Sequence, residues 1–289
     1  MPEVWFPNLG ITIDKLDNVA VTIFGIDLYW YGIIIGCGLI LGFLLAYFTA
    51  KKLGYNADLY IDFIIVAIIA CVISARLYYV IFSWDQYKDN LWKIFAIREG
   101  GLAIYGAVIA AVITAYVFCK RKKLNFWAFT DIAMIGLPLG QAIGRWGNFI
   151  NKEAFGGFTE GLFAMRYMKD TVRGIPQAVA ENILTIEGVE YIQVHPTFLY
   201  ESMWNFALVI LMLIMVKRKK FDGQLIATYF LGYGIGRFWI EGLRTDQLII
   251  GSTGIAVSQV VSLVLIALGI AICIVRRNKE KVNRLELEE

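Results

Sequence analysis

The sequence predicts an all-α polytopic membrane protein with seven transmembrane helices and a small head outside the membrane. Two observations lead to this fold class. Hydrophobic residues make up 58% of the 289 positions, and apolar runs of about 20 residues, the length that crosses a bilayer, recur along the chain. Charged residues fall mainly between these runs, whereas the apolar segments of a soluble protein would be shorter and more broken.

Seven apolar segments define the expected spans in order. They are residues 28–50, 59–83, 100–119, 126–149, 197–216, 223–242 and 252–275. Together they form a membrane domain over residues 28–275. Residues 1–27 mix polar and β-branched side chains, and we expect them at the membrane interface as an amphipathic or strand-like segment. The polar stretch 151–196 is expected to form an extracytoplasmic head, and residues 276–289 a charged cytoplasmic tail.

Basic residues predict the orientation of these spans. Lys and Arg gather in short clusters after the first, third, fifth and seventh spans, namely Lys51–Lys52, 120–123, 217–220 and 276–284. Such clusters remain on the cytoplasmic side of a membrane. The N-terminus is therefore expected outside and the C-terminus inside, in agreement with an odd number of crossings.

Charge and composition exclude several classes of partner. The net charge of +3 is small and the basic clusters flank apolar runs, so no nucleic acid is expected as a partner. The four cysteines lie in separate apolar runs without CxxC spacing, and His195 is the only histidine. These side chains fit neither a disulfide framework nor a usual metal site, so we expect no metal and no cofactor.

The fourth span carries a glycine-lined face followed by polar residues. Gly136, Gly140 and Gly144 recur every four positions, so they share one helix face and allow a neighbouring helix to approach closely. Arg145 follows, and a charge at membrane depth is costly unless it faces a polar cavity. The alternative is an interfacial arginine whose stem reaches the headgroups.

Further polar residues favour the cavity over the interfacial arginine. Asn148, Asn151 and Glu153 come directly after Arg145 and add donors and acceptors that hydrocarbon cannot satisfy. Residues from other spans are expected at the same outer depth. Tyr31 and Tyr105 stand near the outer starts of the first and third spans. His195 and Glu201 flank the outer start of the fifth, where His195 is either a helix-entry residue before Pro196 or part of the site.

The sixth span repeats this pattern. Tyr233, Arg237, Glu241 and Arg244 lie on one stripe of a helix. One interpretation is an internal Arg237–Glu241 ion pair that neutralises two buried charges. Arg145 and Arg244, however, have no obvious acidic partner in their own segments, although acidic residues are available nearby. A surplus of guanidinium groups predicts a phosphate ligand, because arginine binds phosphate through two parallel hydrogen bonds.

The segment from Gly144 to Gly156, GRWGNFINKEAFG, resembles the signature of the prolipoprotein diacylglyceryl transferase family throughout. The resemblance extends to residues 30–32, 100–106, 195–201 and 233–246. It implies seven spans in the bacterial cytoplasmic (inner) membrane and an active site at its outer face. It also implies transfer of the diacylglyceryl group of phosphatidylglycerol to the lipobox cysteine of a prolipoprotein signal peptide, with release of glycerol phosphate.

The motifs and this reaction together predict roles for individual residues. The catalytic candidates are Arg145, Arg237, Tyr105 and Tyr31. The substrate-binding candidates are Arg145, Asn148, Asn151, Glu153, His195, Glu201, Tyr233, Arg237, Glu241 and Arg244. Relatives often have a histidine, cast as the base, at the position of Tyr105. A tyrosine with a pKa of about 10 is a poor base at neutral pH, so the arginines are expected to activate the thiol electrostatically. The glutamates orient the arginines, or one of them is the base.

A membrane transporter or lipid-binding channel is the alternative function. A transporter also lines a cavity with arginines and glutamates, but its polar residues reach the inner face and its halves show inverted repeats. Neither feature is found in this sequence. A seven-span retinal protein is disfavoured because the last span has no lysine for a Schiff base.

Overall fold

The computed structural model describes residues 1–97, 100–251 and 253–288 and forms two compact units. The first unit comprises Met1–Leu45 and Met134–Glu289, and the second comprises Ala46–Ala133. The protein is mostly helical, as the sequence predicts for a polytopic membrane protein. The prediction of an all-α fold is wrong in one respect, because the chain also forms a five-stranded sheet and a two-stranded hairpin.

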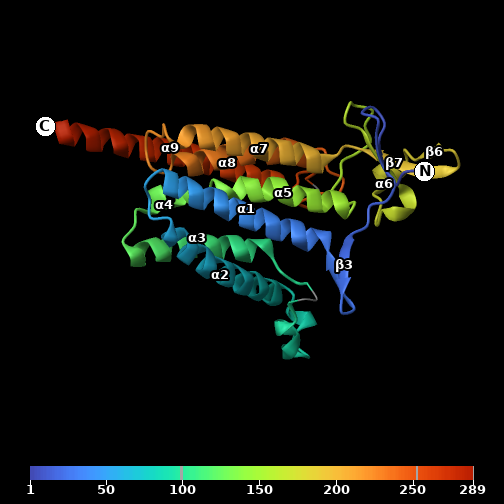
Figure 1. The fold of residues 1–289 in the computed structure, drawn as a ribbon, viewed down its shortest axis with the longest axis horizontal. Coiled ribbons are helices and arrows are strands. Elements are labelled where there is room, and N and C mark those ends of the chain that lie inside the picture. Colours follow the sequence, from blue (N-terminus) through green and yellow to red (C-terminus); the bar gives the residue numbers. More distant parts are fainter. Residues whose placement is uncertain (98–99, 252, 289) are drawn as a thin grey trace. The chain divides into compact units, whose positions relative to one another are not determined.

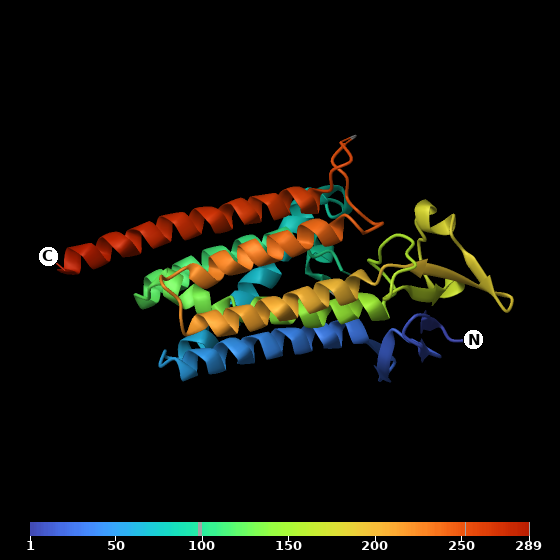
Figure 2. The same cartoon turned by 90° about the horizontal axis from the view of Figure 1, so that it is seen from above.

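Long helices form the membrane part of the first unit (Figures 1 and 2). They are α1 (Trp30–Lys52), whose last turns belong to the second unit, α5 (Gly136–Ile150), α7 (Thr197–Val216), α8 (Gln224–Glu241) and α9 (Val257–Glu288). Helix α5 packs on α7, α7 on α8, and α8 on α9. Because α9 continues to Glu288, most of the predicted charged tail is helical.

Helices α1 and α5 approach each other through glycine. A Cβ atom added at Gly42 would lie 2.5 Å from the carbonyl oxygen of Gly136, and one added at Gly38 would lie 3.0 Å from that of Gly140. Any side chain at Gly42 would therefore push the two backbones apart. The close helix approach predicted for the glycine face of the fourth span is confirmed.

The head is an antiparallel sheet with strand order β2-β1-β5-β7-β6. Its strands are β1 (Val4–Phe6), β2 (Ile11–Ile13), β5 (Met165–Met168), β6 (Leu184–Ile186) and β7 (Val189–Val194). Strand β1 pairs with β5, with Val4 opposite Tyr167. The N-terminal segment and the 151–196 insertion, which the sequence analysis treated as separate, thus share one sheet.

The buried side chains of alternating strand positions pack this sheet against the helices. On β5, Met165 and Tyr167 are buried, whereas Arg166 and Met168 are partly exposed. The buried side chains join Phe149 of α5 and Phe198 of α7 in one hydrophobic core. This core fixes the end of α5 and the start of α7 against the sheet.

Smaller elements complete the first unit. The head also contains the 3-10 helix η4 (Lys169–Thr171) and the short helix α6 (Gln177–Ala180). Strands β3 (Val19–Ile23) and β4 (Ile26–Tyr29) form a separate hairpin that leads directly into α1.

The second unit is a helical hairpin with an elaborate loop. Helices α2 (Asp58–Phe82) and α3 (Ile104–Lys122) lie side by side (Figure 1), and α4 (Phe126–Ala133) follows. The α2–α3 loop contains the 3-10 helices η1 (Trp84–Gln86) and η2 (Leu91–Phe95). Buried Arg76 of α2 donates hydrogen bonds of 2.6 to 3.4 Å to loop carbonyl oxygens, those of Lys93, Ile94, Ala96, Gly100 and Gly101.

Six helices in the described part of the chain are long and apolar enough to cross a membrane. One of them, Phe126–Ile150, combines α4 and α5, which are interrupted before Gly136. Helix α8 is not among the six, because polar residues such as Arg237 and Glu241 lower its hydropathy. The multi-span helical fold is therefore confirmed, while the number seven and the orientation stay predictions.

Candidate functional site

The predicted site residues, with the exception of Tyr105, lie in the first unit. Tyr31 lies at the start of α1. The others come from the end of α5 and the segment after it, from the start of α7 and the residues before it, and from α8 and the turn after it. Tyr105 lies in the first turn of α3 in the second unit, where its ring packs 6.4 Å from that of Tyr78 between centroids.

Glu201 joins two arginines from different helices. Nε of Arg145, on α5, lies 2.7 Å from Oε2 of Glu201, on α7. Nη1 of Arg237, on α8, lies 2.5 Å from the other carboxylate oxygen, Oε1. The two guanidinium groups that the sequence singled out therefore meet at one carboxylate.

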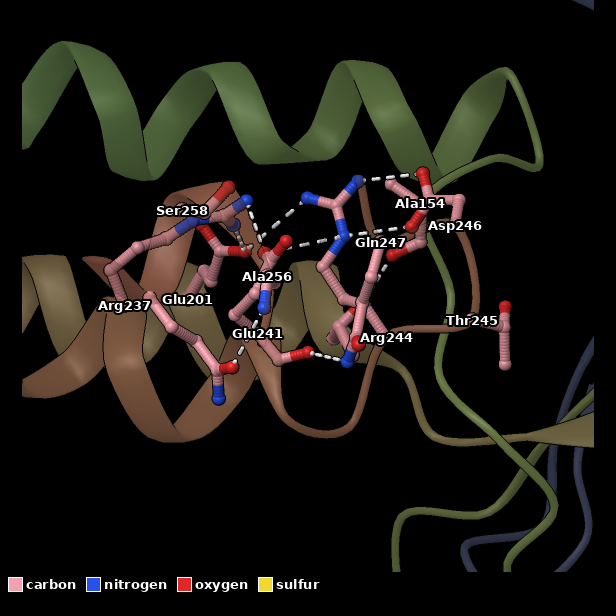
Figure 3. Close-up of polar contacts among 12 residues, drawn as sticks. Ala154, Glu201, Arg237, Glu241, Arg244, Thr245, Asp246, Gln247, Ala256 and Ser258 are labelled. Carbon is pink, nitrogen blue, oxygen red and sulfur yellow. Dashed lines mark hydrogen bonds and ion pairs between the residues drawn. The ribbon is translucent and has the colours of Figure 1, made fainter. Parts of the chain in front are cut away.

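Glu241 and Asp246 extend this cluster. Nη2 of Arg237 lies 2.5 Å from Oε2 of Glu241, one helical turn further along α8. Nε of Arg244 lies 3.9 Å from the same oxygen, and Arg244 donates two parallel hydrogen bonds of 2.9 and 2.7 Å to Asp246. Figure 3 shows the carboxylates of Glu201 and Glu241 between the side chains of Arg237 and Arg244.

The central carboxylates are almost inaccessible to water. Glu201 and Glu241 are each 3% exposed, and a buried charge is tolerated only with a close partner of opposite charge. The nearby acidic residues noted in the sequence, Glu201 and Asp246, are the partners of Arg145 and Arg244. Each arginine of the cluster has a carboxylate partner, and the partner of Arg145 comes from another helix. Even so, two buried carboxylates are shared among three guanidinium groups.

Arg244 and Asp246 shift the pKa of each other. Burial raises the pKa of Asp246, but the hydrogen bonds and positive charge of Arg244 outweigh burial and lower the pKa below its usual value. Burial lowers the pKa of Arg244, and Asp246, Glu201 and Glu241 together more than reverse this change. Both side chains are therefore charged at neutral pH.

A chain of hydrogen bonds leads from Arg145 to Glu153. Nη1 of Arg145 donates to Oδ1 of Asn148 at 3.3 Å, and Nδ2 of Asn148 donates to Oε1 of Glu153 at 2.9 Å. Nδ2 of Asn151 lies 3.4 Å from the same oxygen. Glu153 therefore fixes the amide that contacts Arg145.

The turn that presents Glu153 has an unusual backbone. Lys152 and Ala154, the residues on either side, have φ angles of 54° and 57°. Left-handed backbone of this kind costs about 1 kcal/mol or more for each residue with a side chain. The surrounding contacts must therefore hold the turn in place.

The remaining predicted residues have other surroundings. Tyr233 stacks on Tyr229 with 5.4 Å between ring centroids, and Gln141 donates a 2.9 Å hydrogen bond to the hydroxyl group of Tyr229. Nδ1 of His195 lies 3.2 Å from the hydroxyl group of Tyr200, and burial lowers the pKa of His195. His195 precedes α7 and contacts Tyr200, and its assignment to the substrate site stays a prediction.

Tyr31 lines a cavity of about 1160 Å³ beside the end of α5. The lining includes Asn151, Glu153 and Arg173, together with residues of the β3–β4 hairpin. Its volume is slightly larger than that of typical small-molecule sites, about 300–1,000 Å³. Within the residues that the structure describes, no group of three or more His, Cys, Asp and Glu side chains is placed to hold a metal ion.

Sequence reasoning missed an ion pair in this region. Lys152 contacts Glu3 although the two residues are 149 positions apart. No periodicity or motif connects the two positions, so only the folded chain shows the pair.

The family model and the relatives found by comparison with known proteins indicate the same family. Residues 18–275 match the family model described as prolipoprotein diacylglyceryl transferase. A relative from Bacillus cereus, named phosphatidylglycerol–prolipoprotein diacylglyceryl transferase, is 45% identical over 282 residues, 96% of this chain and 98% of its own. Relatives with the same name from Clostridioides difficile (44%, 93% and 98%) and Finegoldia magna (48%, 88% and 94%) are similar to a comparable degree.

Proposed function

The chain belongs to the prolipoprotein diacylglyceryl transferase family, and we propose that it transfers the diacylglyceryl group of phosphatidylglycerol to the lipobox cysteine of a prolipoprotein. The observation that carries the proposal within this chain is the meeting of Arg145 and Arg237 at Glu201. This arrangement gathers positive charge from separate helices at one place, as recognition of a lipid phosphate requires.

Arg145 is the guanidinium group best placed to receive the phosphate. Its side chain is 22% exposed, compared with 13% for Arg237 and 12% for Arg244. Arg244 pairs with Asp246, and Arg237 pairs with both Glu201 and Glu241. Among the described residues, Arg145 contacts one carboxylate, that of Glu201, which it shares with Arg237. A phosphodiester would therefore add negative charge at the arginine whose carboxylate is shared.

The reaction is a displacement at carbon. The cysteine thiolate attacks the glycerol carbon that carries the phosphate, so a carbon–sulfur bond forms and the carbon–oxygen bond breaks. The electron pair of the broken bond leaves with glycerol phosphate, and the thiol proton is released to water. A thiol pKa of about 8.5 leaves some thiolate at neutral pH, and nearby arginines increase this fraction. The same arginines stabilise the second negative charge that develops on the departing phosphate.

Glu201 and Glu241 hold the arginines in this scheme. Both are buried, and each contacts a guanidinium nitrogen of Arg237 at 2.5 Å. Glu153 acts one step further away, through Asn148.

The proposed site faces the outer leaflet of the bacterial cytoplasmic membrane, with α8 as a seventh span. The charged residues of α8 support this assignment, because Arg237 and Glu241 pair with each other and with Glu201. Paired charges inside a helix bundle are not presented to lipid. The basic clusters at the opposite ends of the helices support a cytoplasmic C-terminus.

Transfer in a purified system tests the function. The protein is placed in nanodiscs containing phosphatidylglycerol, and a lipobox peptide is added without any ion gradient. We expect a peptide whose mass increases by one diacylglyceryl group, and no change in a control peptide with Ser in place of the lipobox Cys. A folded protein that leaves the Cys peptide unmodified would contradict the proposal and favour a carrier or channel.

A further inference from the structure

We propose that the Glu3–Lys152 ion pair is a positioning device for the transfer reaction. It holds the turn that carries Glu153 and thereby fixes Asn148 and Arg145. The inference rests on the function proposed above. Glu3 lies outside residues 18–275, the part of the chain that the family model matches.

The pair is largely buried, and both residues line the cavity that contains Tyr31. Nζ of Lys152 contacts Oε1 of Glu3, and the two side chains are 9% and 13% exposed. The second carboxylate oxygen, Oε2, accepts a 2.7 Å hydrogen bond from the backbone N–H of Leu16. Removing either side chain leaves the other as an unpaired buried charge, which is more costly than the loss of a surface pair.

Glu3 is a fixed anchor because the sheet holds it from both sides. Its N–H donates to the carbonyl oxygen of Ile13 at 2.9 Å, and its carbonyl oxygen accepts from the N–H of Met168 at 2.9 Å. These hydrogen bonds come from the strands on either side of β1. The Glu3 carboxylate therefore fixes the Lys152 side chain relative to the sheet of the head.

Lys152 occupies the point where the segment after α5 reverses. Its φ angle of 54° is unfavourable for a residue with a side chain. Its N–H donates to the carbonyl oxygen of Phe149 at 3.0 Å, and the N–H of Glu153 donates to that of Asn148 at 3.1 Å. Tethering the Lys152 side chain to the sheet therefore limits rotation of the turn that aims Glu153.

The resulting series of contacts runs from the head to the arginine cluster. Glu153 accepts hydrogen bonds from Asn148 and Asn151, and Asn148 accepts one from Arg145. Arg145 in turn contacts Glu201. A shift of the turn would move the guanidinium group that is proposed to bind the phosphate.

Two neutral variants and their combination test the proposal in the full-length protein. Lys152→Met and Glu3→Gln are each expected to lower the kcat of transfer about tenfold, since small misplacements in a reacting geometry are costly. The KM for the peptide should stay within about twofold of wild type. The double variant should lose the same tenfold rather than a hundredfold, because both changes break one contact. Lys152→Arg, which keeps the charge, should retain most of the rate.

Tyr191→Phe is the matched control. The hydroxyl group of Tyr191 donates a 2.8 Å hydrogen bond to the carbonyl oxygen of Pro2, so this variant loosens the same N-terminal strand without touching Lys152. It should lower the unfolding temperature but keep kcat within about twofold of wild type at temperatures where the protein is folded.

Three outcomes would overturn the inference. They are wild-type kcat in both single variants, multiplicative losses in the double variant, and an equal loss of kcat in Tyr191→Phe. Each presupposes transfer by the wild-type protein. Absence of wild-type transfer would instead contradict the proposed function itself.

Discussion

At the scale of residues, the proposed chemistry depends on planar guanidinium groups rather than on positive charge alone. Arg145→Lys and Arg237→Lys are expected to reduce transfer by about a hundredfold, because an ammonium group cannot make two parallel hydrogen bonds to a phosphate. The measurement is the rate of lipobox-peptide modification together with the amount of protein in the membrane. Arg218→Lys, in the basic segment after α7, is the control and should transfer at the wild-type rate.

A substitution at Tyr105 distinguishes a packing role from an acid or base role for this residue. Tyr105→Phe removes the hydroxyl group and keeps the ring that packs against Tyr78. Electrostatic activation of the thiol predicts less than about a threefold loss of rate, since no proton passes through this residue in that scheme. Complete loss of transfer with unchanged binding of phosphatidylglycerol would restore Tyr105 as an acid or base.

The Arg244–Asp246 pair gives a pH dependence of stability. Asp246 has a lowered pKa in the folded protein, where the hydrogen bonds and charge of Arg244 outweigh burial. Its stabilising contribution is therefore present above the unfolded pKa of about 3.9, and is lost as the pH falls through the lower folded value. The contribution at pH 7 should not exceed about 1 kcal/mol, because the Asp246 side chain is 46% exposed.

Thermal unfolding checks this expectation. Asp246→Asn should unfold at a lower temperature than wild type at pH 7, and the difference should shrink in strongly acidic buffer. Asp85→Asn, which removes an exposed partner of Lys88, should show no such difference. A gap between wild type and Asp246→Asn that stays constant down to acidic pH would contradict the assignment.

At the scale of elements, the α1–α5 contact predicts opposite effects for two similar substitutions. Gly42→Ala should destabilise the protein by roughly 1–3 kcal/mol, because the new Cβ atom meets the backbone of Gly136 at 2.5 Å. Gly36→Ala in the same helix meets no atom within 4 Å and should be neutral or stabilising. Unfolding temperatures of the two variants in one detergent provide the comparison, and equal values would argue against the close approach.

The helices were predictable because each apolar segment carries its own signal. The predicted spans coincide with helices to within a few residues for α1, α2 and α7. The interruption of the helix before Gly136 was not predicted, because apolar residues continue across the turn that separates α4 from α5. The sheet of the head was not predicted either, because its strands are short and β1 pairs with a partner more than a hundred residues away.

At the scale of the whole molecule, the proposed topology places the head and the C-terminus on opposite sides of the membrane. Three crossings, α7, α8 and α9, lie between them in this arrangement. If α8 did not span, only two crossings would lie between them, and the head and the C-terminus would be on the same side. Alkaline phosphatase fused after Gly188 should be active outside the cell, and green fluorescent protein at the C-terminus should fluoresce inside. Reporters that place both positions on one side would exclude α8 as a span.

The site was predictable in its residue types and only partly in its contacts. Arg237 and Glu241 are four residues apart on one helix face. This spacing predicted their ion pair, which the structure contains. The pairing of Arg145 with Glu201 joins two helices, and sequence patterns do not show which residues of different helices lie close together. For this reason the sequence showed that acidic residues were available near Arg145 and Arg244, but not which carboxylate each arginine contacts.

The amino-acid sequence by itself determined a helical membrane protein and its family, because hydropathy and a contiguous motif are local properties of a chain. The tertiary structure alone decided which carboxylate each arginine meets and that Glu3 reaches Lys152. Such pairs form between residues far apart in the chain, and their strength depends on burial, which exists only after the helices and the sheet have packed.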